Sequence, residues 1–404
     1  MLKVSNVAGG VAGGTPSAGG RKADAMGESA TTGPATVYLG MSGGVDSSLS
    51  AVLLKEQGYK VVGVYMKNWS KNLPGMKCPW AEDLADAKRV ATRLGIDFKV
   101  FDFEKEYKQK VVDYMLDEFK KGNTPNPDIM CNQEIKFKLF YDVAMEQGAD
   151  FIATGHYARV AGGVAGGTPD GRSREAASTA GESATTGPAT PMLLRAIDEN
   201  KDQTYFLYRI SEDALKHTIF PIGDMYKQDV KALAAEKGLA NAYKKESMGI
   251  CFVGEVGIKD FLKEYIDQEP GEIRELETDK KLGMHEGAIF YTVGQRHGLN
   301  IGGGLPYYVA RKDVEKNIVY VSQNLNASDL WTDELKLKDI VLRSTKTTGP
   351  ATSLQVRLRH RAPLIPAVLD GDTVRFKEKI KAPASGQSVV FYDGEVCLGG
   401  GIIE

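Results

Sequence analysis

The chain has 404 residues, of which 42% are hydrophobic and 26% charged, and its formal net charge at pH 7 is -2. This length suits two or three domains, and the composition is ordinary for a soluble globular protein. The small net charge excludes a strong overall basic field, and no apolar run approaches the roughly 20 residues of a membrane helix. The N-terminus also lacks the apolar core of a secretory signal. Four scattered cysteines, Cys78, Cys131, Cys251 and Cys397, are too few for a disulfide scaffold and favour a reducing cytoplasm.

Residues 1–36 form a low-complexity head dominated by Gly, Ala, Ser and Thr, with too little apolar surface to offset the entropy of ordering. Three pieces of low-complexity text recur along the chain: VAGGVAGGTP at 7–16 and 160–169, SATTGPAT at 29–36 and 183–190, and TTGPAT at 31–36 and 347–352. No copy has a face that could form a core, so they do not read as a structural repeat. We expect flexible linkers, including an insertion at 160–190, with partner binding as the alternative.

A Gly- and Ser-rich turn at residues 40–48 follows a short apolar strand at 37–39 and precedes a helix expected at 45–57. Its glycines let the backbone approach a ligand, and the free N–H groups at the helix start would point toward an anion. Hydroxyls of Ser42, Ser47 and Ser48 would add donors, and Asp46 would hold a metal ion or orient the turn. The turn lacks the lysine of the usual P-loop. The sequence therefore predicts a pyrophosphate cradle of another kind, with an ordinary helix cap as the alternative.

Strands and helices alternate after this turn. Strands are expected at 59–66, 98–103 and 151–154, and helices at 82–94, 104–121 and 135–147. Such alternation predicts an α/β fold, a doubly wound parallel sheet with helices on both faces. Ligands of these sheets bind beyond the carboxyl ends of the strands, so the turn at 40–48, Met66 and the segment at 154–156 should share one rim.

Beyond about residue 258, short β-type runs replace the helical pattern. They lie at 288–293, 307–310, 318–322, 354–359, 373–376 and 388–392. Gly and Pro punctuate them, which predicts small β domains. We expect a first domain at 37–258, a central β domain at 259–325 and a last domain at 326–404.

Two cysteines lie in predicted loops. Cys131 belongs to the Pro-containing segment at 126–132, where Asp128 is close enough in sequence to act on its thiol or on a neighbouring ligand. Cys251 lies in a second loop, next to a glycine at residue 249. Thiolates attack electrophiles and exchange with disulfides, so two loop cysteines together with a predicted pyrophosphate-binding turn suggest sulfur chemistry. The other two cysteines are expected to be small buried hydrophobic residues.

Eight motifs in order make a resemblance specific: GMSGGVDSS, NPDIMCN, ATGHYAR, KDQTYFLY, SMGICFVG, TVGQRHGLNIGGG, RLRHR and ASGQSVVFYDGEVCLGGGIIE. Together they resemble the bacterial tRNA-specific 2-thiouridylases, a family of the PP-loop ATP pyrophosphatase superfamily. The likeness runs from about residue 37 to the C-terminus, and the head and the low-complexity insertions depart from it. It implies a Rossmann-like PP-loop domain followed by two small mainly-β domains, the last a tRNA-binding β-barrel.

The resemblance also implies an activity. Family members use ATP to adenylate the C2 oxygen of wobble uridine 34 in the tRNAs for Lys, Glu and Gln, and release AMP and diphosphate. A persulfide on Cys251 would supply sulfur, and Cys131 would be the nucleophile that completes transfer, leaving a disulfide between them. Asp128 would contact the target base and act as general base. Mg²⁺ is expected with ATP, and a persulfide-carrying protein would be the sulfur donor for a cytoplasmic enzyme, expected to be a monomer.

The family's binding residues carry over by position. Those implied for ATP are Gly40, Met41, Ser42, Gly43, Gly44, Val45, Asp46, Ser47, Met66 and Gly155. Those implied for tRNA are Asn126, Pro127, Asp128, His156, Lys201, Asp202, Gln203, Arg359, His360, Arg361 and Gln387. No dedicated metal ligands are identified. Two other readings stay open: another PP-loop ligase, which would not need the loop cysteines, and a non-catalytic tRNA-binding protein.

Overall fold

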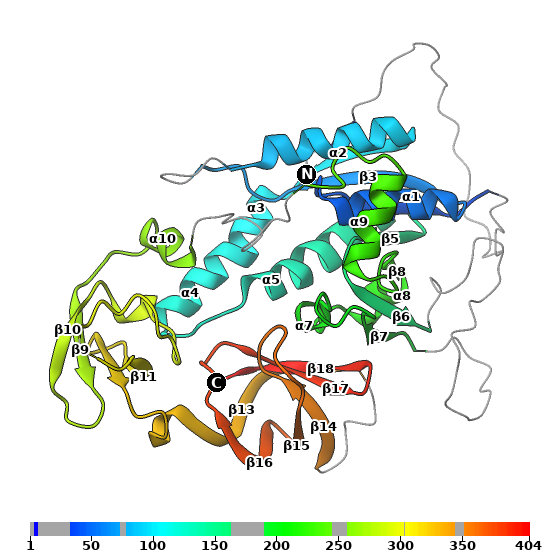
Figure 1. Cartoon of the computed structure of the whole chain (residues 1–404). Coiled ribbons are helices and arrows are strands. Elements are labelled where there is room, and N and C mark those ends of the chain that lie inside the picture. The colour runs from blue at the N-terminus through cyan, green and yellow to red at the C-terminus, as the bar shows by residue number, and fades with distance from the viewer. Residues whose placement is uncertain are drawn as a thin grey trace, which may run out of the picture.

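A six-stranded sheet organises the first part of the computed structural model, which describes residues 4–6, 33–72, 78–162, 190–244, 257–302, 304–343 and 351–404 (Figure 1). Its strands, in spatial order, are β1 (Val4–Asn6), β4 (Asp97–Asp102), β3 (Lys60–Lys67), β2 (Thr36–Gly40), β5 (Phe151–Thr154) and β8 (Thr218–Ile219). All neighbours are parallel except β1, which pairs antiparallel with β4. The predicted parallel sheet is confirmed, and part of the expected flexible head is an edge strand.

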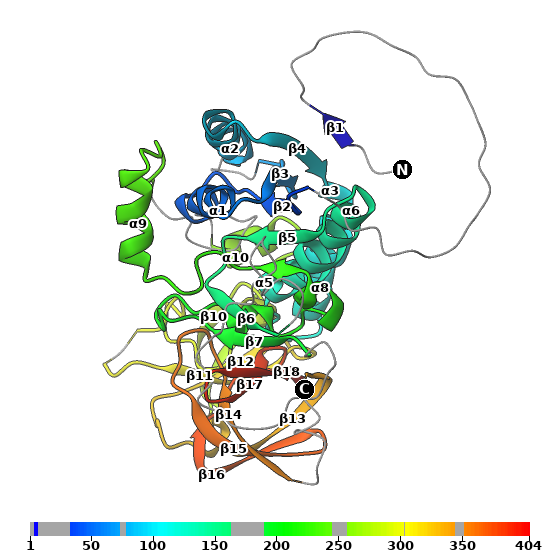
Figure 2. The same cartoon turned by 90° about the vertical axis from the view of Figure 1, so that its right-hand side faces the viewer.

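Helices cover both faces of this sheet (Figures 1 and 2). Period-2 alternation in β2 sends Val37 and Leu39 into one core and Tyr38 into the other. The first core is covered by α1 (Val45–Glu56), α2 (Trp80–Leu94) and α9 (Lys227–Glu236). The second is covered by α3 (Glu104–Tyr107), α4 (Tyr114–Lys120), α5 (Pro127–Met130) and α6 (Phe140–Glu146), with α7 (Thr204–Leu207) and α8 (Glu212–Lys216). Two π-helical stretches, Lys108–Asp113 and Cys131–Leu139, join α3 to α4 and α5 to α6.

A four-stranded sheet follows α10 (Ile258–Lys263). Its spatial order is β10 (Lys281–His285), β9 (Gly271–Glu275), β12 (Ile318–Ser322) and β11 (Tyr308–Asp313). The strand expected at 288–293 is wrong: Ala288–Phe290 forms a short 3₁₀ turn after Gly287, with Ala288 and Phe290 buried. An apolar run this short is compatible with either conformation, and packing decides between them.

The C-terminal part is a six-stranded antiparallel barrel. Its strands in closed order are β13 (Trp331–Leu342), β16 (Thr373–Lys381), β15 (Ile365–Asp370), β14 (Thr352–Arg357), β17 (Ser388–Asp393) and β18 (Val396–Ile403). Pairing of β13 with β18 closes the barrel. The barrel that the family resemblance implied is thereby confirmed.

A hairpin from the first half of the chain extends the barrel sheet. Strands β6 (Ala158–Ala161) and β7 (Met192–Arg195) pair with each other, and β7 pairs with β18. Figure 2 shows this hairpin between the parallel sheet and the barrel. Val160 and Ala161, which the repeated text assigned to the insertion, are therefore part of β6, and residues 163–189 lie outside the described part of the chain. None of the helices described in the chain is both long and apolar enough to cross a membrane.

Candidate active site

The Gly- and Ser-rich turn at residues 40–48 is called the phosphate turn below, because a pyrophosphate cradle is expected there. It lies at the carboxyl end of β2, and β2 pairs with β3 on one side and β5 on the other. A Cβ atom on Gly40 would lie 2.8 Å from Cε of Met66, and one on Gly155 would lie 2.7 Å from the main-chain nitrogen of Ser47. These short distances explain why glycine suits both positions. The parallel sheet thus brings the turn at 40–47, Met66 and Gly155 to one rim, the arrangement expected from the strand order.

The serines of the turn mainly shape its backbone. The Ser47 and Ser48 hydroxyls donate to the carbonyl oxygen of Gly44, at 3.2 and 2.8 Å, and the main-chain N–H of Ser42 donates to Ser47 Oγ at 3.2 Å. Ser47 and Ser48 are buried, whereas Ser42 is exposed. The expectation of three hydroxyls offered to a ligand is therefore wrong for Ser48, which is fully buried and bonded within the protein.

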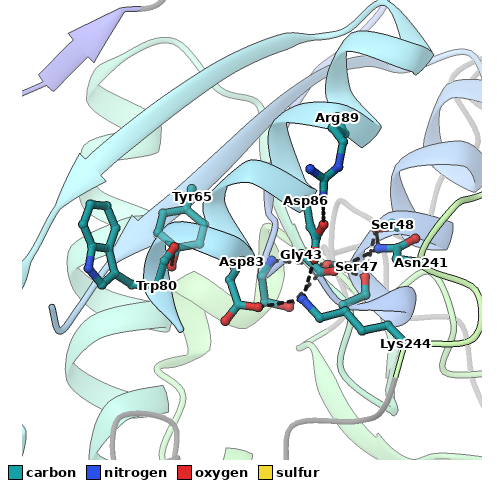
Figure 3. A network of polar contacts seen from close by, with 12 residues as sticks. Gly43, Ser47, Ser48, Tyr65, Trp80, Asp83, Asp86, Arg89, Asn241 and Lys244 are labelled. Atoms are coloured by element: carbon teal, nitrogen blue, oxygen red, sulfur yellow. Dashed lines mark hydrogen bonds and ion pairs between the residues drawn. The ribbon is translucent and has the colours of Figure 1, made fainter. Parts of the chain in front are cut away.

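Asn241, which is distant from this turn in sequence, forms hydrogen bonds to it (Figure 3). Its Nδ2 donates to the carbonyl oxygen of Gly43 at 2.9 Å and to Ser48 Oγ at 2.8 Å, and the residue is 7% exposed. The Asn241 amide therefore stabilises the conformation of the turn. No sequence motif marked this residue, because the contact joins positions 198 residues apart.

Lys244 fixes the beginning of α2 beside the turn (Figure 3). Its Nζ lies 2.8 Å from Asp83 Oδ1 and 2.6 Å from Asp86 Oδ2. Burial lowers the pKa of Lys244, but its hydrogen bonds to both carboxylates outweigh burial and raise the pKa overall. Since Gly43 packs on the carbonyl group of Asp83, this ion pair also holds the helix against the turn.

Gly43→Ala will destabilise the protein by about 1–3 kcal/mol. Gly43 has φ of +75°, and an added Cβ would overlap the Asp83 carbonyl oxygen. Gly44→Ala is the matched control, because Gly44 has φ of -83° and its nearest heavy atom to a new Cβ is 3.4 Å away. Thermal and urea unfolding compare the two variants. Equal stability for both would contradict the steric argument.

Asp46 is oriented by two side chains that the sequence did not indicate. Lys227 Nζ lies 2.6 and 2.7 Å from the two carboxylate oxygens, and the Tyr157 hydroxyl donates to Oδ1 at 3.0 Å. Asp46 was expected either to hold a metal ion or to orient the turn. These contacts support the second role.

The segment carrying Cys131 is helical, so the prediction of a loop is wrong. Asn126 caps α5 by accepting hydrogen bonds from the N–H groups of Asp128 and Ile129, and Pro127 occupies the first helical turn. Asn before Pro starts a helix well, because Asn caps orphan N–H groups and proline lacks the N–H that would be unpaired there. Positions three apart share a helix face, so Asp128 and Cys131 lie on the same side.

Cys131 is 2% exposed at the start of the π-helical stretch, and such stretches often occur at functional sites. The neighbouring Asn132 donates from Nδ2 to the carbonyl oxygen of Phe206 at 3.2 Å, which fixes this helix against α7. Cys78 and Cys397 are buried as expected, and burial raises the pKa of the Cys397 thiol to about 12. Cys251 lies outside the described residues.

Asp202 is internal, which differs from its expected place at a tRNA interface. It is fully buried, and Oδ2 forms an ion pair with Arg357 Nη1 at 2.8 Å. Its Oδ1 accepts hydrogen bonds from the N–H and hydroxyl of Thr204, at 3.2 and 2.8 Å. The Thr204 hydroxyl also lies 3.1 Å from the Tyr392 hydroxyl. In this structure Asp202 therefore anchors the barrel to the first domain and does not present its carboxylate at the surface.

Some of the other predicted tRNA residues are at least partly exposed, and others are hydrogen-bonded within the protein. Lys201, Arg359 and Arg361 are at least partly exposed, and both arginines lie on the barrel loop after β14. Gln203 accepts a hydrogen bond from the Tyr157 N–H at 2.9 Å, and Gln387 donates to the Thr124 carbonyl oxygen.

His156 lies on the same rim as the phosphate turn, and its Nδ1 lies 2.8 Å from Thr154 Oγ1. Its ring lies 5.8 Å from that of Phe137. Burial, with a smaller contribution from Lys136, holds the pKa of His156 well below its ordinary value of 6.5. The imidazole is therefore neutral near pH 7.

His360 packs on the ring of Phe206 with centroids 4.6 Å apart, and its Nδ1 is buried without a hydrogen-bond partner among the described residues. Burial, then the nearby Arg361 charge, lowers its pKa from 6.5 to about 4. The unfolded chain therefore binds a proton at this residue as pH falls below 6.5, while the folded chain does so only near pH 4. The contribution of neutral His360 to the free energy of unfolding is complete above pH 6.5 and is lost as the pH falls from 6.5 to about 4.

His360→Phe will flatten the pH dependence of stability between pH 6.5 and about 4, because phenylalanine keeps the ring contact and does not titrate. Unfolding midpoints measured across this range for wild type and variant provide the comparison. The exposed His297, changed to Asn, is the control. If His360→Phe leaves the pH dependence of stability unchanged, titration of the His360 ring is not its cause.

Protein-family models match almost all of the chain outside the head. They are described as a tRNA methyl transferase HUP domain at residues 35–255, a tRNA methyl transferase PRC-barrel domain at 259–323 and an aminomethyltransferase beta-barrel domain at 332–403. A solved structure of a predicted tRNA methyltransferase subunit from Methanocaldococcus jannaschii covers 50% of this chain and 76% of its own, at 18% identity and a TM-score of 0.28.

Curated relatives are much more similar. The tRNA-specific 2-thiouridylase MnmA of Exiguobacterium sibiricum is 46% identical over 375 residues, which is 91% of this chain and 94% of the relative. The tRNA-specific 2-thiouridylase MnmA of Bacillus subtilis strain 168 is 45% identical over the same shares of both chains. With identity of this level over nearly the full length, the chain belongs to the tRNA-specific 2-thiouridylase family.

Proposed function

We propose that the protein is a tRNA sulfurtransferase that converts the wobble uridine of tRNA to 2-thiouridine at the expense of ATP. The observation that carries this proposal is the near-full-length similarity to 2-thiouridylases at 46% identity, in a chain that keeps the phosphate turn and Cys131. The described domains would divide the work. The parallel sheet would bind ATP, and the barrel would bind RNA.

ATP would bind at the rim formed by the turn at 40–47, Met66 and Gly155. The N-terminus of α1 offers N–H groups and a positive dipole end to phosphates. Mg²⁺ would arrive on the phosphates, and Asp46 is the carboxylate within the turn that could contact it. The described residues contain no cluster of three or more His, Cys, Asp or Glu side chains that could hold a metal without a ligand. When bound, Mg²⁺ would neutralise phosphate charge.

The first step would attach AMP to the substrate. The C2 oxygen of uridine attacks the α-phosphorus of ATP, and diphosphate leaves with the bonding electron pair. A carbonyl oxygen is a poor leaving group, whereas AMP is a good one. Asp128, on the same helix face as Cys131, would contact the base and accept its proton.

The second step would transfer sulfur. The terminal sulfur of a persulfide on Cys251 attacks C2, and AMP leaves, giving a base joined through two sulfurs to Cys251. The Cys131 thiolate then attacks Cys251 Sγ. The S–S electron pair returns to the sulfur on C2, which gives 2-thiouridine and a Cys131–Cys251 disulfide. An external reductant restores both thiols, and a persulfide-carrying protein reloads Cys251.

RNA would contact the surface near α5 and the barrel loop after β14. Exposed Arg359 and Arg361 can pair with phosphates, and Asn126, Lys201 and His156 are among the partly exposed residues of the first domain that the resemblance implies for RNA. Buried Asp202 would act on RNA only through the structure that it supports. We expect tRNAs for Lys, Glu and Gln as substrates, a cytoplasmic location, a monomer, and domain boundaries near residues 37, 259 and 326.

Nucleoside mass spectrometry of tRNA incubated with the protein, ATP, Mg²⁺ and a persulfide-carrying sulfur donor tests the proposal. The expected product is 2-thiouridine at position 34, formed together with AMP and diphosphate. Cys251→Ala should abolish this product. If ATP is cleaved but no thiolated nucleoside forms, the activity belongs to another PP-loop ligase, and small-molecule acceptors become the candidates. If tRNA binds but ATP is never consumed, the protein is a non-catalytic RNA-binding protein.

A further inference from the structure

The phosphate turn receives a lysine from a distant helix. Lys227 is the first residue of α9, its side chain is 9% exposed, and its Nζ contacts both carboxylate oxygens of Asp46 at 2.6 and 2.7 Å. The two residues are 181 positions apart in sequence. Asp46 lies in the first turn of α1, which directly follows the Gly-rich segment in sequence. The ammonium group is therefore located at the helix end that faces the expected phosphates.

Lys227 is held firmly at this position. Its main-chain N–H donates to Asp198 Oδ2 at 3.0 Å, and Asp198 is 8% exposed. Its Nζ lies 5.6 Å from the centre of the Tyr157 ring, whose hydroxyl donates to the same Asp46 carboxylate. The Asp46 carboxylate and the Tyr157 ring thus hold the Lys227 ammonium group, and Asp198 holds its main chain. A lysine placed in this way loses little conformational entropy when it binds a ligand.

Two helix N-termini also meet here. The helices α1 and α9 pack in one core, and Asp46 and Lys227 lie in their first turns. Each N-terminus carries a partial positive charge, and Lys227 adds a full one. Asp46 balances that charge in the described structure. The combination favours an anion with several oxygens, such as a polyphosphate.

We propose that Lys227 is the phosphate-binding lysine of this ATP site. It supplies from α9 the cation that a P-loop carries within the loop itself, where this chain has Val45. Asp46 positions the ammonium group, which donates to phosphate oxygens of bound ATP and stabilises the negative charge that develops on diphosphate as it leaves. This inference rests on the proposed use of ATP.

A double-mutant cycle separates direct phosphate contact from simple neutralisation of Asp46. Equilibrium dissociation constants for ATP with Mg²⁺ are measured for wild type, Lys227→Met, Asp46→Asn and the double variant. Direct contact predicts that Lys227→Met weakens ATP binding at least about tenfold in both the wild-type and the Asp46→Asn backgrounds. Lys227→Gln, a second neutral variant, should behave like Lys227→Met, and thermal unfolding confirms that each variant is folded.

Lys237→Met is the matched control. Lys237 pairs with Glu56 at 2.6 Å, so it joins the other ends of the same two helices, at an exposed position. Its loss should leave the affinity for ATP unchanged. Wild-type affinity in both neutral Lys227 variants would overturn the proposal. So would a loss that disappears in the Asp46→Asn background, because the lysine would then act only by cancelling the aspartate. If the wild-type protein does not bind ATP, the proposed function fails instead.

Discussion

Cys131→Ala will abolish 2-thiouridine formation, while the folded structure and binding of ATP persist. In the proposed mechanism, the variant would still carry the persulfide on Cys251 but would have no thiolate to break the S–S bond after sulfur has reached C2. The expected loss exceeds about a thousandfold, because no neighbouring group replaces a missing nucleophile efficiently. Single-turnover assays with a preloaded persulfide and nucleoside mass spectrometry measure it. The base should also remain attached to the protein through two sulfurs, as a reductant-sensitive RNA adduct.

Cys78→Ala is the control for Cys131→Ala, since Cys78 is also a buried cysteine. It should retain thiolation. Cys397 is less suitable for comparison, because it is buried within barrel strand β18 and burial raises the pKa of its thiol to about 12, which keeps it protonated. Thiolation at the wild-type rate by Cys131→Ala would contradict the role proposed for this residue and would leave Cys251 as the sole essential thiol.

Asp202→Ala will destabilise the protein by about 3–5 kcal/mol, because it leaves the buried guanidinium of Arg357 without its partner carboxylate. It also removes the acceptor for the Thr204 N–H and hydroxyl, within a network that reaches Tyr392 in the barrel. The barrel should therefore loosen from the first domain before either part unfolds. Urea unfolding and limited proteolysis measure both effects.

An exposed ion pair of the barrel provides the control for Asp202→Ala. Arg375 and Glu334 pair across neighbouring strands with half-exposed side chains. Glu334→Ala should change stability by less than about 1 kcal/mol, since solvent screens such pairs. Similar effects of the two substitutions would show that Asp202 does not anchor the barrel. A selective loss of tRNA binding at full stability would instead restore a direct RNA contact for Asp202.

Local sequence determined the elements whose signals are short-range. The apolar run at 37–39, the glycines of the turn and the helical spacing after residue 45 predicted β2, the turn and α1 almost to the residue. Alternation of strands and helices then implied a parallel sheet, and a parallel sheet brings its carboxyl ends to one rim. For this reason the turn, Met66 and Gly155 could be assigned to one site before any contact was known.

The helix carrying Cys131 shows where local interpretation failed. The proline-containing segment at 126–132 suggested a loop, but Asn126 caps the chain and Pro127 starts a helix. The same residues favour both structures, and packing of Ile129 and Ile135 into the core decides for the helix. The run at 288–293 failed for the same reason, because apolar residues fit a buried 3₁₀ turn as well as a strand.

By itself, the sequence determined the fold class, the phosphate turn and, through its motifs, the family. Only the tertiary structure decided which charged side chains act inside the protein. Lys227 and Asn241 contact the turn from about 180 to 200 positions away, Lys244 contacts the start of α2 beside it, and Asp202 is a buried anchor of the barrel where an RNA surface was expected. The physical reason is that periodicity and propensity are local, whereas burial and charge pairing depend on residues that meet only when the sheet, the hairpin and the barrel have assembled.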